Sequence, residues 1–195
     1  MLGECHAHLM MNAVDYQRAV ADNARAPRED LVRGFLEEYR RLGISFLRDG
    51  GDRLGVSRLA KELAPEYGID YRSPIFAIHK AGHYGRVVGF PFETMGEYRD
   101  LVARAKAQGA DFIKIMLSGI LDFDRYGVIT SAGLPVEEAR EMVRIAHGEG
   151  LAVMAHVNGR DCILTALEAG IDSLEHGYGM DGSCLRALRD EGGVG

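Results

Sequence analysis

Four histidines and one lysine stand near the ends of short apolar segments, and together they could bind metal ions. His6 and His8 lie in GECHAHL, Lys114 in DFIKIMLSG, His156 in AVMAHVNG and His176 in SLEHGYG. Side chains alternate between the two faces of a strand, so His6 and His8 share one face. Imidazole nitrogens are common ligands of zinc and related metals. The pattern therefore predicts a metal site that holds two ions.

Lys114 supports this interpretation because its two neighbours in the strand should face outward, which places the lysine on the inner face. Ile113 and Ile115 should pack outward against helices, which turns the lysine toward the interior. Burial lowers the pKa of a lysine and favours the neutral amine, which can add carbon dioxide to form a carbamate with two oxygens that could bridge two cations. The alternative is that the amine reaches solvent along its own stem, and that each histidine is an ordinary core or rim residue.

Strands and helices are expected to alternate along the whole chain. A glycine ends four of the helices just before the next strand, in RLGI, EYGI, AQGAD and EAGID. The expected strands are residues 2–5, 44–49, 71–80, 111–117, 151–157 and 171–177. The expected helices are residues 28–42, 55–68, 93–109, 135–150, 160–170 and 181–193.

This alternation predicts an α/β fold with a parallel sheet. The carboxyl ends of parallel strands meet at one rim in a barrel, which suits ligands at so many strand ends. A complete (β/α)8 TIM barrel typically needs about 250 residues, so we expect an incomplete one with about six βα units. An open doubly wound sheet is the alternative, but neither GxGxxG nor GxxxxGK[ST] is present.

Composition favours one globular domain over residues 1–195. The chain is 47% hydrophobic and 27% charged, and its net charge of −6 argues against nucleic-acid binding. No apolar run approaches the roughly 18 residues of a membrane span, and the N-terminus lacks the pattern of a signal peptide. Three cysteines without CxxC spacing predict reduced thiols in the cytoplasm, with Cys5 pointing away from His6.

Five segments resemble the amidohydrolase superfamily in its two-metal form: GECHAHL, ISFLRDGGD, DFIKIMLSG, VMAHVNG and DSLEHG. They are most similar to the imidazolonepropionase-related branch, which includes dipeptidases of the Xaa-Pro type. The resemblance implies that His6 and His8 bind the more buried metal and that His156 and His176 hold the more exposed one. It also implies that Lys114 is carboxylated and bridges both ions. Zinc is the expected metal, with manganese and iron as alternatives.

The chain departs from the family pattern in three ways. Glu4 stands where the family usually has aspartate, two residues before the first histidine. The N-terminal part of the small β-sandwich common in the family is expected to be absent. The aspartate that the family takes from strand eight, as metal ligand and general base, is expected to have no counterpart here, because the resemblance ends before strands seven and eight. Asp122 and Asp124 are expected to be solvated loop residues, so no catalytic base is assigned. The resemblance predicts a C-terminally truncated member of the family.

Three residues are candidates for contact with a small-molecule substrate. His83, in IHKAGHYGR, resembles a histidine near the substrate of related dipeptidases, and Arg48 with Asp49 matches a family element. Tyr126 lies in the long loop after the fourth strand. Each has an ordinary alternative: a loop histidine, a structural ion pair or an exposed tyrosine.

The expected function is metal-dependent hydrolysis of a C–N bond in a small molecule, such as an amide, a peptide or a cyclic amide. The alternative is a truncated, inactive homolog that at most binds metal. We expect this chain alone to lack turnover. Its unpaired first and sixth strands should favour association into homo-oligomers or aggregates.

Overall fold

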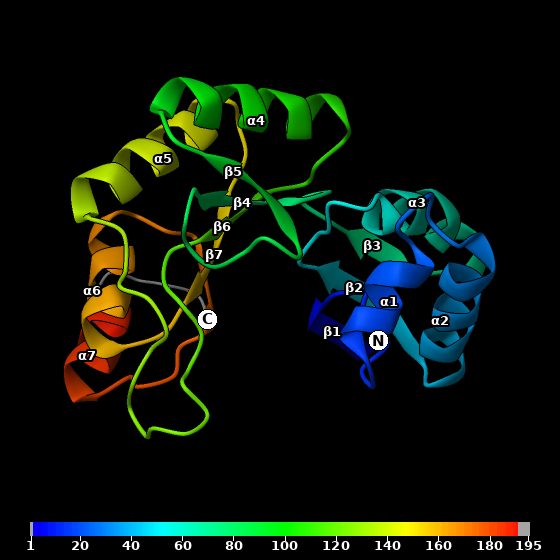
Figure 1. Cartoon of the computed structure of the whole chain (residues 1–195), viewed down its shortest axis with the longest axis horizontal. Coiled ribbons are helices and arrows are strands. Elements are labelled where there is room, and N and C mark those ends of the chain that lie inside the picture. Colours follow the sequence, from blue (N-terminus) through cyan, green and yellow to red (C-terminus); the bar gives the residue numbers. More distant parts are fainter. Residues whose placement is uncertain (1, 191–195) are drawn as a thin grey trace.

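The computed structural model describes residues 2–190, in which strands and helices alternate (Figure 1). The strands are β1 (Leu2–Ala7), β2 (Ile44–Asp49), β3 (Asp70–Arg72), β4 (Ala77–Lys80), β5 (Gly89–Phe92), β6 (Ile113–Met116), β7 (Val153–Val157) and β8 (Ser173–His176). The helices are α1 (Tyr16–Asp22), α2 (Glu29–Arg41), α3 (Val56–Leu63), α4 (Met95–Ala107), α5 (Val136–Gly148), α6 (Arg160–Glu168) and α7 (Gly182–Asp190), with a 3-10 turn, Ala64–Tyr67, after α3. The end of the last expected helix, residues 191–193, lies outside the described residues.

The strands form two sheets whose strand pairs are all parallel. One sheet has the order β1-β2-β3 and the other the order β5-β4-β6-β7-β8. Helices α2 and α3 lie beside the first sheet, and α4 to α7 follow one another around the second (Figure 1). Parallel strands with helices on their outer side are the arrangement of a (β/α) barrel. The predicted fold class, an incomplete barrel of about six βα units, is confirmed.

The third barrel strand is divided, whereas the sequence predicted one strand over residues 71–80. Its first part, β3, pairs with β2, and its second part, β4, pairs with β6. Between them Ile75 adopts a left-handed backbone with φ of 67°, and its N–H donates to Ser73 Oγ at 2.9 Å. Pro74, just before it, also lacks the N–H that a continuous ladder would use. This break allows the two sheets to part at the third strand.

Two elements were not expected from the sequence. Helix α1 begins after Asp15, whose side chain accepts hydrogen bonds from the N–H groups of Gln17 and Arg18. Strand β5 pairs with β4 inside a segment that was expected to be loop. Gly89 there lies so close to Ala77 that an added Cβ would clash with its backbone, so the pairing depends on glycine at this position.

The apolar core lies between the sheets and the helices, not inside the barrel. Ile113 and Ile115 of β6 are buried in a cluster with residues of α4 and α5, including Val102 and Met142. Lys114 points to the opposite, inner face. A second cluster packs β2 against α2 and α3. The inner face of the strands carries Lys114 together with a small apolar cluster of Ala77, Val88 and Met116.

Ion pairs connect the two sheets. Lys61 of α3 pairs with Asp111, just before β6, and Arg72 of β3 approaches the same carboxylate at 3.5 Å. Arg48 of β2 pairs with Glu175 of β8 at 2.8 Å. None of the described helices combines the length and the apolarity needed to cross a membrane.

Candidate metal centre

All five predicted ligand residues line one cavity of about 420 Å³. The cavity lies at the carboxyl ends of the strands, which is the end of a (β/α) barrel that carries active sites. Its predicted ligands are His6, His8, Lys114, His156 and His176. The rest of its lining is mainly apolar or aromatic: Met11, Tyr84, Val88, Met116, Ile120, Leu121, Phe123, Asn158 and Tyr178.

The imidazole rings form a continuous series across the barrel interior. The ring centroids of His8 and His6 are 5.4 Å apart, those of His6 and His176 are 4.8 Å apart, and those of His176 and His156 are 4.6 Å apart. Tyr84 ends the series, with its ring 4.9 Å from that of His156. Residues from β1, β7 and β8, far apart in sequence, thus meet at one place.

His8 follows the end of β1 and is held against the turn after β2. Its Nδ1 lies 3.0 Å from the carbonyl oxygen of Gly51. Gly50 makes this approach possible, because a Cβ at that position would lie 2.7 Å from His8 Nε2. A carbonyl can only accept, so Nδ1 carries the proton and Nε2 keeps its lone pair. Burial lowers the pKa of His8, which favours this neutral, metal-binding form.

His176 reaches the cavity only because the backbone turns at the end of β8. In the register of β7 and β8, Glu175 lies opposite His156 and shares its inward face. Simple alternation would therefore send His176 outward with Leu174. Instead His176 has a left-handed backbone with φ of 72°, and its ring contacts those of His6 and His156. Burial lowers its pKa to about 4.

His156 sits at the deep side of the cavity with Asn158 beside it. Its Nε2 lies 3.2 Å from the Gly119 carbonyl, which also accepts from Asn158 Nδ2 at 3.2 Å. Nε2 also lies 3.3 Å from Asn158 Nδ2, so it can donate to the carbonyl or accept from the amide, and the neutral ring keeps one nitrogen lone pair in either tautomer. Burial lowers the pKa of His156 to about 3, and the neighbouring His176 further disfavours protonation. The ring is therefore neutral at physiological pH.

Lys114 is the most unusual group in the cavity. It is 1% exposed, and its Nζ has no hydrogen-bond partner among the described residues. Burial lowers its pKa to about 7, so that about half of the amines are neutral near that pH. A buried amine without a partner is costly in a protein, which is typical of a group that awaits a ligand or a modification.

This set of donors fits divalent metal ions. Neutral imidazoles with free lone pairs are the form that binds metal, and the unpartnered Lys114 amine offers a place for a further oxygen ligand after carboxylation. Within residues 2–190, no three His, Cys, Asp or Glu side chains by themselves form a group placed to hold one ion. A site here therefore depends on Lys114, which is not one of those residue types.

The three predicted substrate contacts are not brought to the histidine cavity. His83 lines an adjoining cavity of about 500 Å³, which shares Met11 and Tyr84 with the first. Tyr126 is fully exposed and lines neither cavity. Arg48 is bound to protein groups: its Nε donates to the Cys5 carbonyl at 2.8 Å and its Nη2 to Glu175. A role for Tyr126 or Arg48 in substrate contact finds no support in these positions.

Sequence reasoning missed two residues that matter to the cavity. Glu175 contacts His6, with 2.5 Å between Oε2 and Nδ1. It stands beside His176, and the pairing of β8 with β7 was needed to show which of the two faces inward. Tyr84 lies in a loop, where no periodicity could have placed its ring against His156.

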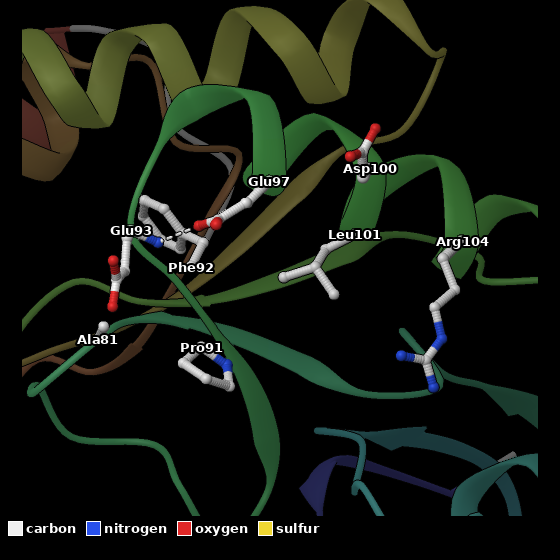
Figure 2. Close-up of a pocket in the computed structure, with 8 residues that line it drawn as sticks. All are labelled: Ala81, Pro91, Phe92, Glu93, Glu97, Asp100, Leu101 and Arg104. Atoms are coloured by element: carbon white, nitrogen blue, oxygen red, sulfur yellow. Dashed lines mark hydrogen bonds between the residues drawn. The ribbon is translucent and has the colours of Figure 1, made fainter.

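A third hollow, of about 430 Å³, lies beside α4 and β5 (Figure 2). Glu97 points toward the start of the helix there and accepts from the N–H groups of Glu93 at 2.7 Å and Thr94 at 3.1 Å. It thereby completes the capping box of α4.

Known proteins resemble this chain in structure but not in sequence. No protein-family model and no curated protein matches it. Solved structures do match, including the A. niger ochratoxinase (TM-score 0.74, 24% identity, 50% of that chain). A prolidase complexed with N-methylphosphonate-L-proline has a TM-score of 0.74 and 22% identity over 51% of its chain. A Xaa-Pro dipeptidase with methionine bound in its active site has a TM-score of 0.71 and 20% identity, also over 51%.

Each of these matches covers 98% of this chain, which therefore spans about half the length of the proteins it resembles. At this level of identity the likeness establishes the fold. It agrees with the barrel that the resemblance to amidohydrolases predicted.

Proposed function

We propose that this chain carries the metal-binding half of an amidohydrolase barrel that hydrolyses a C–N bond, of an amide, a peptide or a cyclic amide, in a small molecule. The observation that carries the proposal is the buried, unpartnered amine of Lys114, which shares one cavity with four imidazoles. The solved structures of this fold include a prolidase, a Xaa-Pro dipeptidase and an ochratoxinase, which supports the class of reaction.

The cavity divides into two pairs of histidines with the lysine as their common neighbour. His6 and His8 would hold one divalent ion, and His156 and His176 would hold the other. Zinc suits these ligands best, with manganese or iron as alternatives. The chemistry that such ions supply is activation of water and polarisation of a carbonyl group near neutral pH.

Lys114 would provide the bridging ligand. Its neutral Nζ forms a bond to the carbon of carbon dioxide and releases one proton to solvent, which leaves a carbamate with one negative charge and two oxygens. The lowered pKa keeps the neutral amine available at physiological pH. A charged ammonium ion could not make this bond, because its nitrogen has no lone pair.

The remaining lining indicates what kind of substrate the cavity would accept. Tyr84, Met116, Ile120, Phe123 and Tyr178 give the cavity a largely apolar lining beside the histidines. Apolar surface of this kind binds by excluding water and contributes little to the recognition of charge. A small molecule with an apolar group next to its scissile amide is therefore the favoured substrate.

One observation favours a second candidate function, metal binding without turnover. Among residues 2–190, no aspartate or glutamate lines the cavity, and a carboxylate would be the ordinary general base for this reaction. If no other group takes that role, the chain would bind metal and leave amides intact.

Metal and carbamate content test the proposal directly. The protein is dialysed with zinc and ¹³C-labelled bicarbonate, its zinc is measured by elemental analysis, and the carbamate is observed by ¹³C NMR. We expect two zinc ions per chain and one carbamate signal. Lys114→Ala should lose the signal and the two-metal binding, and short carboxylic acids should partly restore the metal. Lys114→Arg should not be rescued, because a guanidinium cannot form the carbamate.

The matched control is Lys80→Ala, since Lys80 also lies in a strand but pairs with Glu138 outside the cavity. Its zinc and carbamate content should equal those of the unchanged chain. Full zinc content in Lys114→Ala would contradict the proposal. A panel of dipeptides and cyclic amides then separates the two functions: metal-dependent hydrolysis supports the enzyme, and metal binding without hydrolysis supports the second candidate.

A further inference from the structure

We propose that Glu175 is a positioning residue that fixes the ring of His6, and that Arg48 holds Glu175 in the orientation this requires. The part of the proposal that concerns metal affinity rests on the proposed function. The part that concerns the His6 ring stands on contacts within the chain and can be tested without metal.

Glu175 is a buried carboxylate whose oxygens are both engaged. Its side chain is 6% exposed. Oε2 lies 2.5 Å from His6 Nδ1, while Oε1 accepts from Arg48 Nη2 at 2.8 Å and from Ser173 Oγ at 2.7 Å. These partners come from β1, β2 and β8, so the carboxylate joins strands of both sheets inside the barrel.

The contact with Glu175 decides which nitrogen of His6 faces the cavity. The guanidinium of Arg48 donates to Oε1 at 2.8 Å, and an ion pair of this kind favours the carboxylate form of Glu175. An ionised carboxylate only accepts, so His6 Nδ1 must donate and Nε2 must keep its lone pair. Carboxylates play this role beside many metal-binding histidines.

Arg48 gives the carboxylate its orientation. Besides Glu175, its guanidinium donates to the Cys5 carbonyl at 2.8 Å and to Ser173 Oγ at 3.2 Å. Three of its nitrogens are thus tied to β1 and β8, which leaves the group little freedom. The planar fork of arginine is suited to holding a carboxylate in this way.

This arrangement also bears on Lys114. Glu175 shares the inner face of the sheet with Lys114 in the register of β6, β7 and β8, and an unrestrained carboxylate inside the barrel would be drawn to an ammonium. In the structure both oxygens of Glu175 are held by Arg48, Ser173 and His6, and the Lys114 amine has no hydrogen-bond partner among residues 2–190. Arg48 therefore serves the site indirectly, by keeping Glu175 on His6 and away from Lys114.

The first test reads the tautomer of His6 in the metal-free protein by ¹⁵N NMR of the imidazole nitrogens. In the unchanged chain His6 should carry its proton on Nδ1. In Glu175→Ala the ring should revert to the Nε2–H form that free histidine prefers, or to a mixture, while His8 keeps its signal because its partner is the Gly51 carbonyl. Glu175→Gln, whose amide oxygen can still accept, should restore part of the Nδ1–H form.

The second test measures zinc affinity by competition with a chelator. Glu175→Ala should weaken binding by about 10- to 100-fold, and Glu175→Gln by less. Glu138→Gln is the matched control, because Glu138 is also a half-buried partner of a cation but lies outside the cavity. It should leave zinc affinity and the His6 signal unchanged, even if thermal stability falls.

Arg48→Met provides a variant that keeps Glu175 itself. Freed from its anchor, Glu175 should pair with Lys114, so the carbamate signal should fall and His6 should lose its single tautomer. A folded Glu175→Ala or Arg48→Met protein in which His6 remains in the Nδ1–H form would overturn the proposal. If the unchanged chain binds no zinc, the proposed function fails, and the tautomer alone then decides the role of Glu175.

Discussion

Two clusters of buried polar groups lie at the carboxyl ends of the strands, and they differ in how far their hydrogen bonds are satisfied. In the first, after β2, Asp49 accepts from Leu9 N at 2.8 Å and Gly51 N at 2.6 Å, and Asp52 accepts from Leu54 N at 2.7 Å and Ser57 N at 2.6 Å. In the second, the histidine cavity, the Lys114 amine has no hydrogen-bond partner among the residues that the structure describes. The carboxylates of the first cluster are held by backbone N–H groups, whereas the amine of the second is available to a ligand.

This difference indicates that the Asp49 and Asp52 cluster has a structural role, whereas the histidine cavity has a role in ligand binding. Buried polar groups are normally paired, and a fully paired network makes the backbone around it rigid. The Asp49 and Asp52 cluster fixes the turn after β2, and that turn carries Gly51, whose carbonyl orients His8. The paired cluster therefore supports the unpaired one, which keeps its donors available.

The largest expected effect is on stability, from breaking the paired cluster. Asp49→Ala leaves the N–H groups of Leu9 and Gly51 buried without acceptors, which should lower the free energy of unfolding by about 3 kcal/mol. Urea unfolding followed by circular dichroism measures this. Asp30→Ala, at an exposed ion pair with Arg28, is the control and should change stability by less than about 0.5 kcal/mol. An equal loss of stability in Asp49→Ala and Asp30→Ala would mean that the hydrogen bonds of Asp49 do not stabilise the fold as proposed.

A substitution in the histidine cavity is expected to raise the free energy of unfolding, not to lower it. Lys114→Met replaces a buried amine that has no partner with an apolar side chain of similar length, which should raise the stability of the metal-free protein by about 1 to 2 kcal/mol. The same unfolding experiment, with chelator present, checks it. A clear loss of stability would mean that Lys114 already has a structural partner in solution.

The turn after β2 connects the two clusters by orienting His8, and a substitution at Gly50 tests this connection. Gly50→Ala would place a Cβ against the His8 ring and should displace that ring from Gly51 rather than unfold the protein. We expect zinc affinity to fall about tenfold, which corresponds to about 1.4 kcal/mol, with a change in the His8 NMR signal. Gly34→Ala, in α2 with no atom within 4 Å of the added Cβ, should change neither. An unshifted His8 signal in Gly50→Ala would argue against the close approach.

The smallest expected effect is a pH dependence in the paired cluster. Burial raises the pKa of Asp52 above its ordinary value of 3.8, although hydrogen bonds from Ser57 oppose the shift. A raised pKa in the folded state favours the protonated carboxyl, so its contribution to stability is full below pH 3.8 and declines as the pH rises through the folded pKa. The unfolding free energy of the unchanged chain minus that of Asp52→Asn should decline over this range. A difference that stays flat or grows with pH would show that the hydrogen bonds outweigh burial.

Much of the site could be predicted from sequence because strand periodicity is a local rule. The spacing of His6 and His8 implies a shared face, and Ile113 and Ile115 imply that Lys114 faces the interior, as the structure has it. The alternation of strand and helix implies a barrel whose strand ends meet at one rim. These inferences need only the neighbours of each residue along the chain.

Tertiary structure decided the features in which the backbone leaves that periodicity or side chains meet across strands. The positive φ of Ile75 divides the third strand, and that of His176 turns its ring inward although Glu175 holds the inward position in the register. The hydrogen bonds of Glu175 to His6 and Arg48 join residues more than a hundred positions apart. Local sequence determines which face a strand residue prefers, but only the packed barrel determines where a strand breaks and which buried groups find partners, because those depend on neighbours supplied by other strands.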